Sequence, residues 1–251
     1  MDSLAYRLKE FLPGADRRTL VLDTSAGLWL GVLSGLEDFG MAVRPLLSQL
    51  DGLVCSPGQI RRLENRTRKE AALLVRVDWT NALRSSSFPL HPETTSYISI
   101  LDAKDALELG ASAMVISFLL GYEEEIEAGC LKNTVQLALT GKEFGLPLVV
   151  EVLPLGPRIS LPGKAVELGA SYALEGGADV VVLPYPGRDS LTIISAMLSV
   201  PWMLKPTSAE TAEGEWGEAQ SLGATGLWLD HSWLKSVHRL EQISEQVHKT
   251  Q

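Results

Sequence analysis

Short apolar runs alternate with helix-like segments along most of this chain. Eight runs are rich in Val, Ile and Leu and end at polar, Pro or Gly residues, which is typical of buried parallel strands. These runs are residues 19–25, 52–57, 73–79, 113–121, 146–154, 178–186, 201–208 and 226–232. Helical patterns lie between them, several with a Gly near the end where a helix stops, at 102–111, 123–145 and 163–178.

This alternation predicts an α/β fold, a closed (β/α)8 barrel of the TIM type. A doubly wound open sheet gives the same alternation, but it more often carries a Gly-rich fingerprint after its first strand. The corresponding stretch, DTSAGLWLG (23–31), matches GxGxxG poorly. No domain boundary stands out, so we expect residues 1–251 to form a single domain.

Two segments extend this predicted barrel. The N-terminal residues MDSLAYRLKEFLPG predict a short amphipathic helix that stops at Pro13 and Gly14. The stretch 80–98 contains Ser and Pro with little periodicity and follows the third run. It is therefore a candidate lid over the face where the strands end.

Composition narrows the possible classes of protein. The 251 residues are 45% hydrophobic and 21% charged, which suits one large core and excludes a wholly disordered chain. The formal net charge of −9 without a basic run argues against nucleic-acid binding. Apolar runs are too short to span a membrane and the N-terminus lacks a continuous apolar stretch, so we expect no membrane association and a cytoplasmic protein. Cys55 and Cys130 predict buried, reduced thiols.

Charged residues interrupt the predicted strands, although the outer face of a barrel strand must be apolar to pack against helices. They are Asp23, Arg76, Asp78, Glu151, Lys205 and Asp230. We expect these side chains to point into the barrel or to lie at the strand ends, where this fold carries out its chemistry. Because buried charges need partners, the sequence predicts the ion pairs Arg76–Glu151 and Lys205–Asp230.

Lys205 is the main catalytic candidate, because it closes the apolar run PWML at a strand end. Burial lowers the pKa of an amine and favours attack on a carbonyl, whereas a neighbouring carboxylate raises it, and the sequence leaves this balance open. The carboxylates of Asp23, Asp78, Glu151 and Asp230 are candidates for moving protons. Candidate substrate-binding residues are Arg76, Tyr185, His231 and Ser25.

Each of these residues also has a purely structural interpretation. The ion pairs can simply fill the barrel, and Asp78 can be a solvated loop end. His231 can be a loop or capping residue, and Tyr185 a rim aromatic. The scattered histidines suggest no metal site, so we predict no metal and no other cofactor. A divalent cation on Asp78, Glu151 and Asp230 is the weaker alternative.

The order of motifs resembles the class I aldolases of the archaeal fructose-bisphosphate aldolase type, in the DeoC/LacD superfamily. GLPLVVEVLPLGP (145–157) is similar to the family's fifth strand with its Tyr-Pro-Arg-Gly ending. ALEGGADVVVLPYPG (173–187) is similar to the sixth strand, Gly-Ala-Asp-Ile-Val-Lys followed by Tyr-Thr-Gly. The resemblance covers nearly the whole chain and extends to bacterial thiolases of autoinducer breakdown and to aminodideoxyheptulosonate synthases. It implies an aldolase barrel and a homo-oligomer.

The catalytic residues of that family are replaced here. The resemblance places its Schiff-base lysine on Val182, its proton-transferring tyrosine on Leu153, the tryptophan two residues earlier on Glu151, and its Asp-His-Gly on Ser25-Ala26-Gly27. Its phosphate-binding Gly-Gly falls on KPTS (205–208), and its Gly-Arg falls on Asp230-His231. A phosphate would lose backbone donors and an arginine and would meet a carboxylate instead. We therefore predict a substrate without phosphate.

Three functional hypotheses remain open. The first is a carbon–carbon lyase that forms a Schiff base at a relocated Lys205 with a small carbonyl or sugar-like compound, while a carboxylate moves protons. The second is a catalytically degenerate aldolase-fold protein that serves as a ligand-binding, regulatory or assembly subunit. The third is an acid–base lyase or isomerase without an imine. A charged pocket around Lys205 favours the enzymes, and a mouth filled by hydrophobic side chains favours the subunit.

Overall fold

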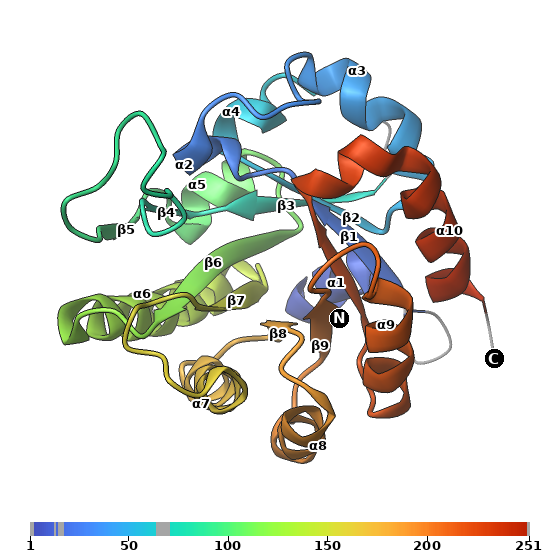
Figure 1. Ribbon diagram of the computed structural model, residues 1–251. Helices are drawn as coiled ribbons and strands as arrows, with labels where there is room; N and C mark the ends of the chain where they lie inside the picture. The colour runs from blue at the N-terminus through green and yellow to red at the C-terminus, as the bar shows by residue number, and fades with distance from the viewer. Residues whose placement is uncertain (1–2, 13, 15–17, 64–70, 250–251) are drawn as a thin grey trace.

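Eight parallel strands close into a barrel that is surrounded by helices (Figure 1). The computed structural model describes residues 3–12, 14, 18–63 and 71–249. The barrel strands are, in ring order, β1 (Thr19–Asp23), β10 (Gly226–Asp230), β9 (Trp202–Lys205), β8 (Val180–Pro184), β7 (Leu148–Pro154), β6 (Ala113–Leu120), β3 (Ala72–Arg76) and β2 (Gly52–Cys55). The predicted (β/α)8 barrel is confirmed.

The helices lie where the sequence predicts them, around the outside of the ring. They are α1 (Ser3–Phe11), α2 (Gly27–Leu30), α3 (Phe39–Val43), η1 (Arg44–Gln49), α4 (Pro57–Ile60), α5 (Ala103–Glu108), α6 (Glu124–Phe144), α7 (Pro162–Glu175), α8 (Arg188–Met197), α9 (Ala212–Ser221), η2 (His231–Ser236) and α10 (Val237–His248). The long helix α6 has acidic residues in its first turn and ends at Gly145, which adopts a left-handed φ of 61°. Both features stabilise helix ends.

The inside of the barrel is apolar over the first part of each strand. Val21, Val54, Leu74, Val115, Val149, Val182, Met203 and Trp228 form this inner cluster, and all are fully buried. Phe11 of α1 joins the cluster from below, and the Thr19 hydroxyl donates a hydrogen bond to its carbonyl oxygen at 2.8 Å. The predicted N-terminal helix is thus present and closes the floor of the barrel. Of its predicted stop, Pro13 lies outside the described residues.

The ring closes between β1 and β10, where Thr19 is paired with Gly226. A Cβ atom at position 226 would lie 2.2 Å from the Thr19 carbonyl oxygen, so this close approach requires glycine.

The third apolar run divides into two strands. β3 ends at Arg76, and β4 (Asp78–Thr80) forms an antiparallel hairpin with β5 (Tyr97–Ser99). The Trp79 indole N–H donates to the carbonyl of Leu28 at 3.0 Å, and Nε of Arg84 donates to that of Trp29 at 2.8 Å. The segment 80–98 is therefore attached to α2, and its action as a lid stays a prediction.

Two further expectations have a structural counterpart. Cys55 and Cys130 are buried free thiols, as predicted. Among the residues that the structure describes, no helix is both long enough and apolar enough to cross a bilayer.

Candidate functional site

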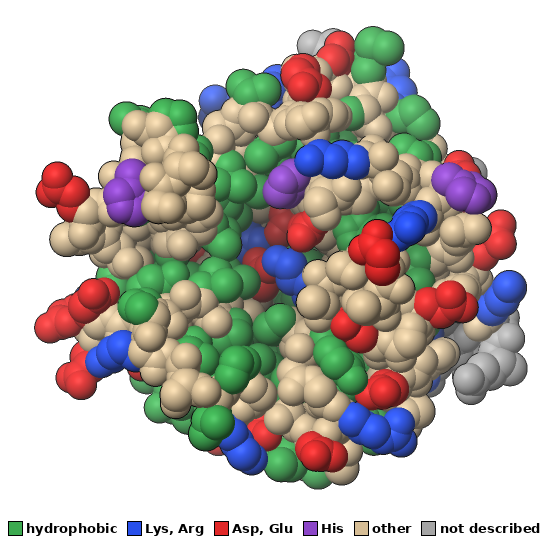
Figure 2. Space-filling model, viewed as in Figure 1, with side chains coloured by type: hydrophobic (Ala, Val, Ile, Leu, Met, Phe, Trp, Pro, Cys, Tyr) green, Lys and Arg blue, Asp and Glu red, His purple; other side chains and the backbone are tan. Residues whose placement is uncertain are grey.

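Charged side chains gather inside the barrel at the carboxyl ends of its strands. Asp23, Arg76, Glu151, Lys205 and Asp230 each stand two residues after a member of the inner cluster or its strand equivalent, and we call these five residues the ionic layer. Figure 2 shows a hollow near the middle of this face in which acidic and basic side chains meet. The predicted inward orientation of these charges is confirmed by their mutual contacts.

Arg76 is the centre of the ionic layer and is fully buried. Its Nη2 donates to Oδ2 of Asp23 at 2.5 Å and to Oε2 of Glu151 at 2.7 Å. Its Nη1 donates to the hydroxyl of Ser117 at 3.1 Å, and its Nε donates to that of Ser25 at 3.2 Å. Every nitrogen of the guanidinium group therefore has a partner, and the predicted Arg76–Glu151 ion pair is present.

The surroundings keep the Arg76 guanidinium charged. Burial by itself lowers the pKa of this group, but the carboxylates of Asp23, Glu151 and Asp78 raise it, and the net pKa lies above its ordinary value. The guanidinium carbon also lies 5.4 Å from the centre of the Trp29 ring, a cation–π distance. Arg76 thus holds the carboxylates in place as a fixed positive charge.

Lys205 extends the ionic layer toward solvent. Its Nζ donates to Oε1 of Glu151 at 2.7 Å, and its side chain is 25% exposed against 4% for Glu151. Burial raises the pKa of Glu151, but Lys205 and Arg76 lower it to about 2. Burial likewise lowers the pKa of Lys205, and Glu151 more than reverses this, so the pKa of the amine is raised. The balance that the sequence left open therefore favours the ammonium form.

The predicted Lys205–Asp230 ion pair is wrong. Lys205 reaches across β8, whose Val182 and Pro184 leave room at this level, and binds Glu151 instead. The carboxylate of Asp230 accepts hydrogen bonds from the backbone N–H and the hydroxyl of Ser232. Asp230 therefore bends the chain after β10, while its charge still raises the pKa of Lys205.

Asp78 and Ser25 lie behind Arg76 and have no exposed surface. Oδ2 of Asp78 accepts the backbone N–H of Ser117 at 2.9 Å, and its Oδ1 lies 3.8 Å from Arg76. Burial raises the pKa of Asp78, although Arg76 opposes this shift. The Ser25 hydroxyl donates to Oδ1 of Asp23 at 2.6 Å. These contacts favour support of Arg76 over contact with a substrate, and the solvated-loop interpretation of Asp78 is wrong.

Tyr185 faces away from the ionic layer. Its hydroxyl donates to Oε2 of Glu218 on α9 at 2.8 Å. Because Pro184 precedes it with the inward parity of Val182, the tyrosine has the outward parity, so the predicted pocket donor is a rim residue. His231 is half-buried beside Asp230, and its buried Nδ1 has no hydrogen-bond partner among the described residues. Substrate contact by His231 stays a prediction.

Ser117 and Trp29 belong to the site, although sequence reasoning did not select them. Ser117 has the inward parity of Val115 in β6, and its hydroxyl lies on Arg76. That parity was a usable signal, whereas no pattern in the sequence marks Trp29. In the described ranges of the chain, no three His, Cys, Asp or Glu side chains are arranged to hold a metal ion.

Residues 16–211 match the sequence profile of the DeoC/LacD family aldolases. The chain belongs to this family. It is 27% identical over 180 residues to an uncharacterised aldolase of Pasteurella multocida, which covers 71% of this chain and 58% of that relative. The chain thus spans less than two thirds of that relative's length. It is 26% identical over 235 residues to the 3-hydroxy-5-phosphonooxypentane-2,4-dione thiolase of Klebsiella pneumoniae, covering 92% of this chain and 75% of the thiolase.

Solved structures of aldolases share the fold. A Schiff-base-forming fructose-1,6-bisphosphate aldolase superposes with a TM-score of 0.79 at 18% identity, over 98% of this chain and all of the other. An archaeal fructose 1,6-bisphosphate aldolase gives the same TM-score and identity over 97% of this chain and 98% of the other. At this identity, the likeness establishes the DeoC/LacD barrel and leaves the chemistry to the residues present.

The residues at the aldolase family's catalytic positions are apolar in this chain. Val182, where the resemblance places the Schiff-base lysine, is fully buried in the inner cluster, and Leu153 is 6% exposed. The Cα partner of Val182 on β9 is Met203, and Lys205 stands two residues further toward the mouth. An amine is therefore present one strand away from the family position and closer to solvent.

Proposed function

We propose that this chain is an aldolase-like carbon–carbon lyase that forms a Schiff base between Lys205 and a small carbonyl compound. The observation that carries the proposal is the position of Nζ of Lys205, 2.7 Å from a buried carboxylate at the open end of an aldolase-family barrel. Lys205 is the only lysine in the eight barrel strands, all of which the structure describes. A mouth lined by charges also favours an enzyme over a degenerate subunit.

The amine must be neutral before it attacks. In the resting protein it is an ammonium group, so Lys205 first transfers a proton to Glu151 or to water at the mouth. Nζ then adds to the carbonyl carbon, and loss of water gives an iminium group. As the adjacent carbon–carbon bond breaks, the iminium accepts its electron pair and a carboxylate removes the proton of the hydroxyl that becomes an aldehyde.

The remaining steps return the site to its starting state. A carboxylic acid protonates the enamine carbon, and water hydrolyses the imine to release the second product. Glu151 and Asp230 are the carboxylates on the strands nearest to Lys205, so we assign proton transfer to this pair. Arg76 keeps Glu151 in position and remains charged throughout.

Reductive trapping tests this proposal. Borohydride is added with hydroxyacetone or dihydroxyacetone, and the modified residue is located by mass spectrometry of peptides. We expect an adduct on Lys205 that disappears in Lys205→Met and persists in Lys104→Met, which removes a lysine whose side chain is 67% exposed. An adduct that survives in Lys205→Met refutes the placement, and so does the absence of any adduct.

The charged state of Lys205 favours a second candidate, a lyase or isomerase without an imine. In that mechanism the ammonium group polarises the carbonyl and the carboxylates move protons. Lys205→Arg separates the two, because arginine keeps the charge and cannot form the imine. Turnover of hydroxy ketones that survives in Lys205→Arg supports the second mechanism, and complete loss supports the first.

The substrate is proposed to lack phosphate, unlike the compounds named for the relatives. The Klebsiella pneumoniae thiolase is named for a phosphonooxy compound, and the similar solved structures are fructose-1,6-bisphosphate aldolases. The mouth of this barrel has Asp230 where the resemblance places part of the phosphate grip, and a carboxylate there repels a phosphate.

A further inference from the structure

Two loops decide whether a barrel of this kind holds phosphate. TIM barrels frequently bind phosphate with the loops that follow their seventh and eighth strands, where free backbone N–H groups and a helix N-terminus face the anion. In this chain these strands are β9 and β10. The loops in question are residues 206–211, before α9, and the turn that begins η2.

The chain's own side chains already occupy the N–H groups of these loops. The backbone N–H of Thr207 donates to Oε2 of Glu215 at 2.8 Å, and that of Ser232 donates to Oδ1 of Asp230 at 2.8 Å. The N–H groups of Glu210 and Thr211 share the hydroxyl of Ser208, at 3.2 and 3.3 Å. Glu215 is buried, so it is held in this position by the fold. A carboxylate therefore stands on each loop where an anion would bind.

The cations of the ionic layer do not offset these carboxylates. Arg76 is matched by Asp23 and Glu151, and Lys205 is matched by Glu151. Across the described ranges, no Lys, Arg or His nitrogen lies within 4.0 Å of the Asp230 carboxylate. A phosphate that entered the mouth would meet an excess of negative charge.

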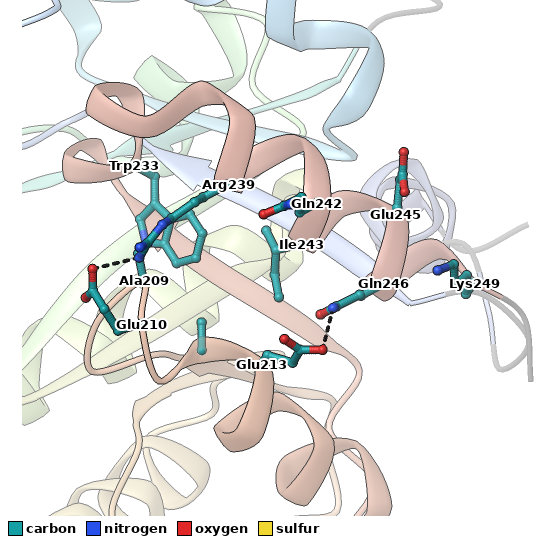
Figure 3. Close-up of a pocket in the computed structure, with 11 residues that line it drawn as sticks. Ala209, Glu210, Glu213, Trp233, Arg239, Gln242, Ile243, Glu245, Gln246 and Lys249 are labelled. Atoms are coloured by element: carbon teal, nitrogen blue, oxygen red, sulfur yellow. Dashed lines mark hydrogen bonds and ion pairs between the residues drawn. The ribbon is translucent and has the colours of Figure 1, made fainter.

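The outer side of the first loop is braced against α10. Figure 3 shows Glu210 paired with Arg239 and Gln246 with Glu213, across a groove of about 490 Å³ between α9 and α10. The distances are 2.6 Å from Nη1 of Arg239 to Glu210 and 2.7 Å from Nε2 of Gln246 to Glu213. These bridges fix the start of α9, and with it the position of Glu215.

We propose that Glu215 and Asp230 are specificity-determining residues that close both loops to phosphate, so that the site selects an uncharged carbonyl compound. This inference rests on the proposed function for the location of the site and deepens it by naming the residues that define the substrate class. Neither residue needs to take part in bond making for this role.

Equilibrium binding tests the proposal without requiring chemistry. Dihydroxyacetone phosphate, dihydroxyacetone and inorganic phosphate are titrated calorimetrically into the wild type and into the double variant Glu215→Ala with Asp230→Ala. Removing both carboxylates frees the N–H groups of Thr207 and Ser232, so we expect the affinity for dihydroxyacetone phosphate to rise at least about tenfold. Affinity for dihydroxyacetone should change much less.

Two further variants control for charge and for folding. Glu215→Gln with Asp230→Asn keeps an acceptor for each N–H group but removes the charge, so we expect a smaller gain than in the alanine pair. Glu218→Gln removes a carboxylate from the same helix that binds Tyr185 instead of a loop N–H, and it should leave phosphate affinity unchanged. Circular dichroism melts identify which double variant is folded, and the conclusion is drawn from that one.

Two results overturn the inference. One is a wild type that binds dihydroxyacetone phosphate more tightly than dihydroxyacetone, and the other is a folded double variant without any gain. The same titrations in Lys205→Met separate this proposal from the first. A phosphate gain without borohydride trapping supports the specificity role while Lys205 fails, and trapping without a phosphate gain shows the reverse.

Discussion

Two levels of the same barrel differ sharply although only one pair of strand residues separates them. At the lower level the inner cluster packs Val, Leu, Met and Trp228 around Phe11, with no charge. At the upper level the same strands carry the ionic layer, and Arg76 replaces what would be another apolar side chain after Leu74. The lower level is held by packing, which tolerates a small change at one position.

The upper level is held by mutual charge. Each carboxylate there depends on Arg76 or Lys205, and removing one partner leaves the others buried without compensation. The comparison therefore predicts that the two levels respond to substitution by different mechanisms and to different degrees.

The largest effect is expected at the centre of the ionic layer. Arg76→Met leaves Asp23, Glu151 and Asp78 in one buried site, and we expect the free energy of unfolding to fall by about 3–5 kcal/mol. Urea denaturation measures this loss. Arg158→Met is the matched control, because its side chain is 51% exposed and its ion pair with Glu127 should contribute less than about 1 kcal/mol. Equal losses in the two variants would contradict the role of Arg76.

An intermediate effect is expected on acid stability. The pKa of Glu151 is lowered from 4.5 to about 2 in the folded protein, so its ionised form stabilises the fold above pH 4.5. This stabilisation, of about 3 kcal/mol, is lost as the pH falls from 4.5 toward 2. Glu151→Gln should therefore show a shallower loss of unfolding free energy over this interval than the wild type.

Glu108→Gln serves as the control for that measurement. The Glu108 side chain is 68% exposed, so its removal should leave the acid dependence of the wild type intact. Identical slopes for Glu151→Gln and the wild type would mean that the ion pairs of Glu151 do not stabilise the folded state.

The smallest effect is expected in the inner cluster. The indole N–H of Trp228 is buried and has no hydrogen-bond partner among the described residues, so Trp228→Phe breaks no hydrogen bond. We expect a loss of about 1 kcal/mol from the lost volume alone, measured by urea denaturation. A loss as large as that of Arg76→Met would erase the contrast between the two levels.

Strand parity made most of this arrangement predictable from the sequence. Apolar runs located the eight barrel strands, and charges within those runs had to face inward because the outer faces pack against helices. The pair Arg76–Glu151 follows from this reasoning and is observed at 2.7 Å.

Partner choice across the ring was less predictable. Adjacent strands suggested Lys205–Asp230, but the short side chains of β8 let Lys205 reach Glu151, and Ser232 took the Asp230 carboxylate. Such choices depend on the stagger of neighbouring strands and on local turns, which a single sequence does not encode as a pattern. Trp29 and Glu215 were missed for the same reason, since both reach the site from outside the barrel strands.

Phe11 gives the barrel a blind end. With the floor sealed by α1, a molecule that enters the ring has to depart by the doorway through which it came. For a lyase that cleaves one compound into two, this traffic is sequential: the first fragment must clear the entrance before water can arrive to free the second. The short helix at the start of the chain thus imposes an order on product release at the opposite end of the molecule.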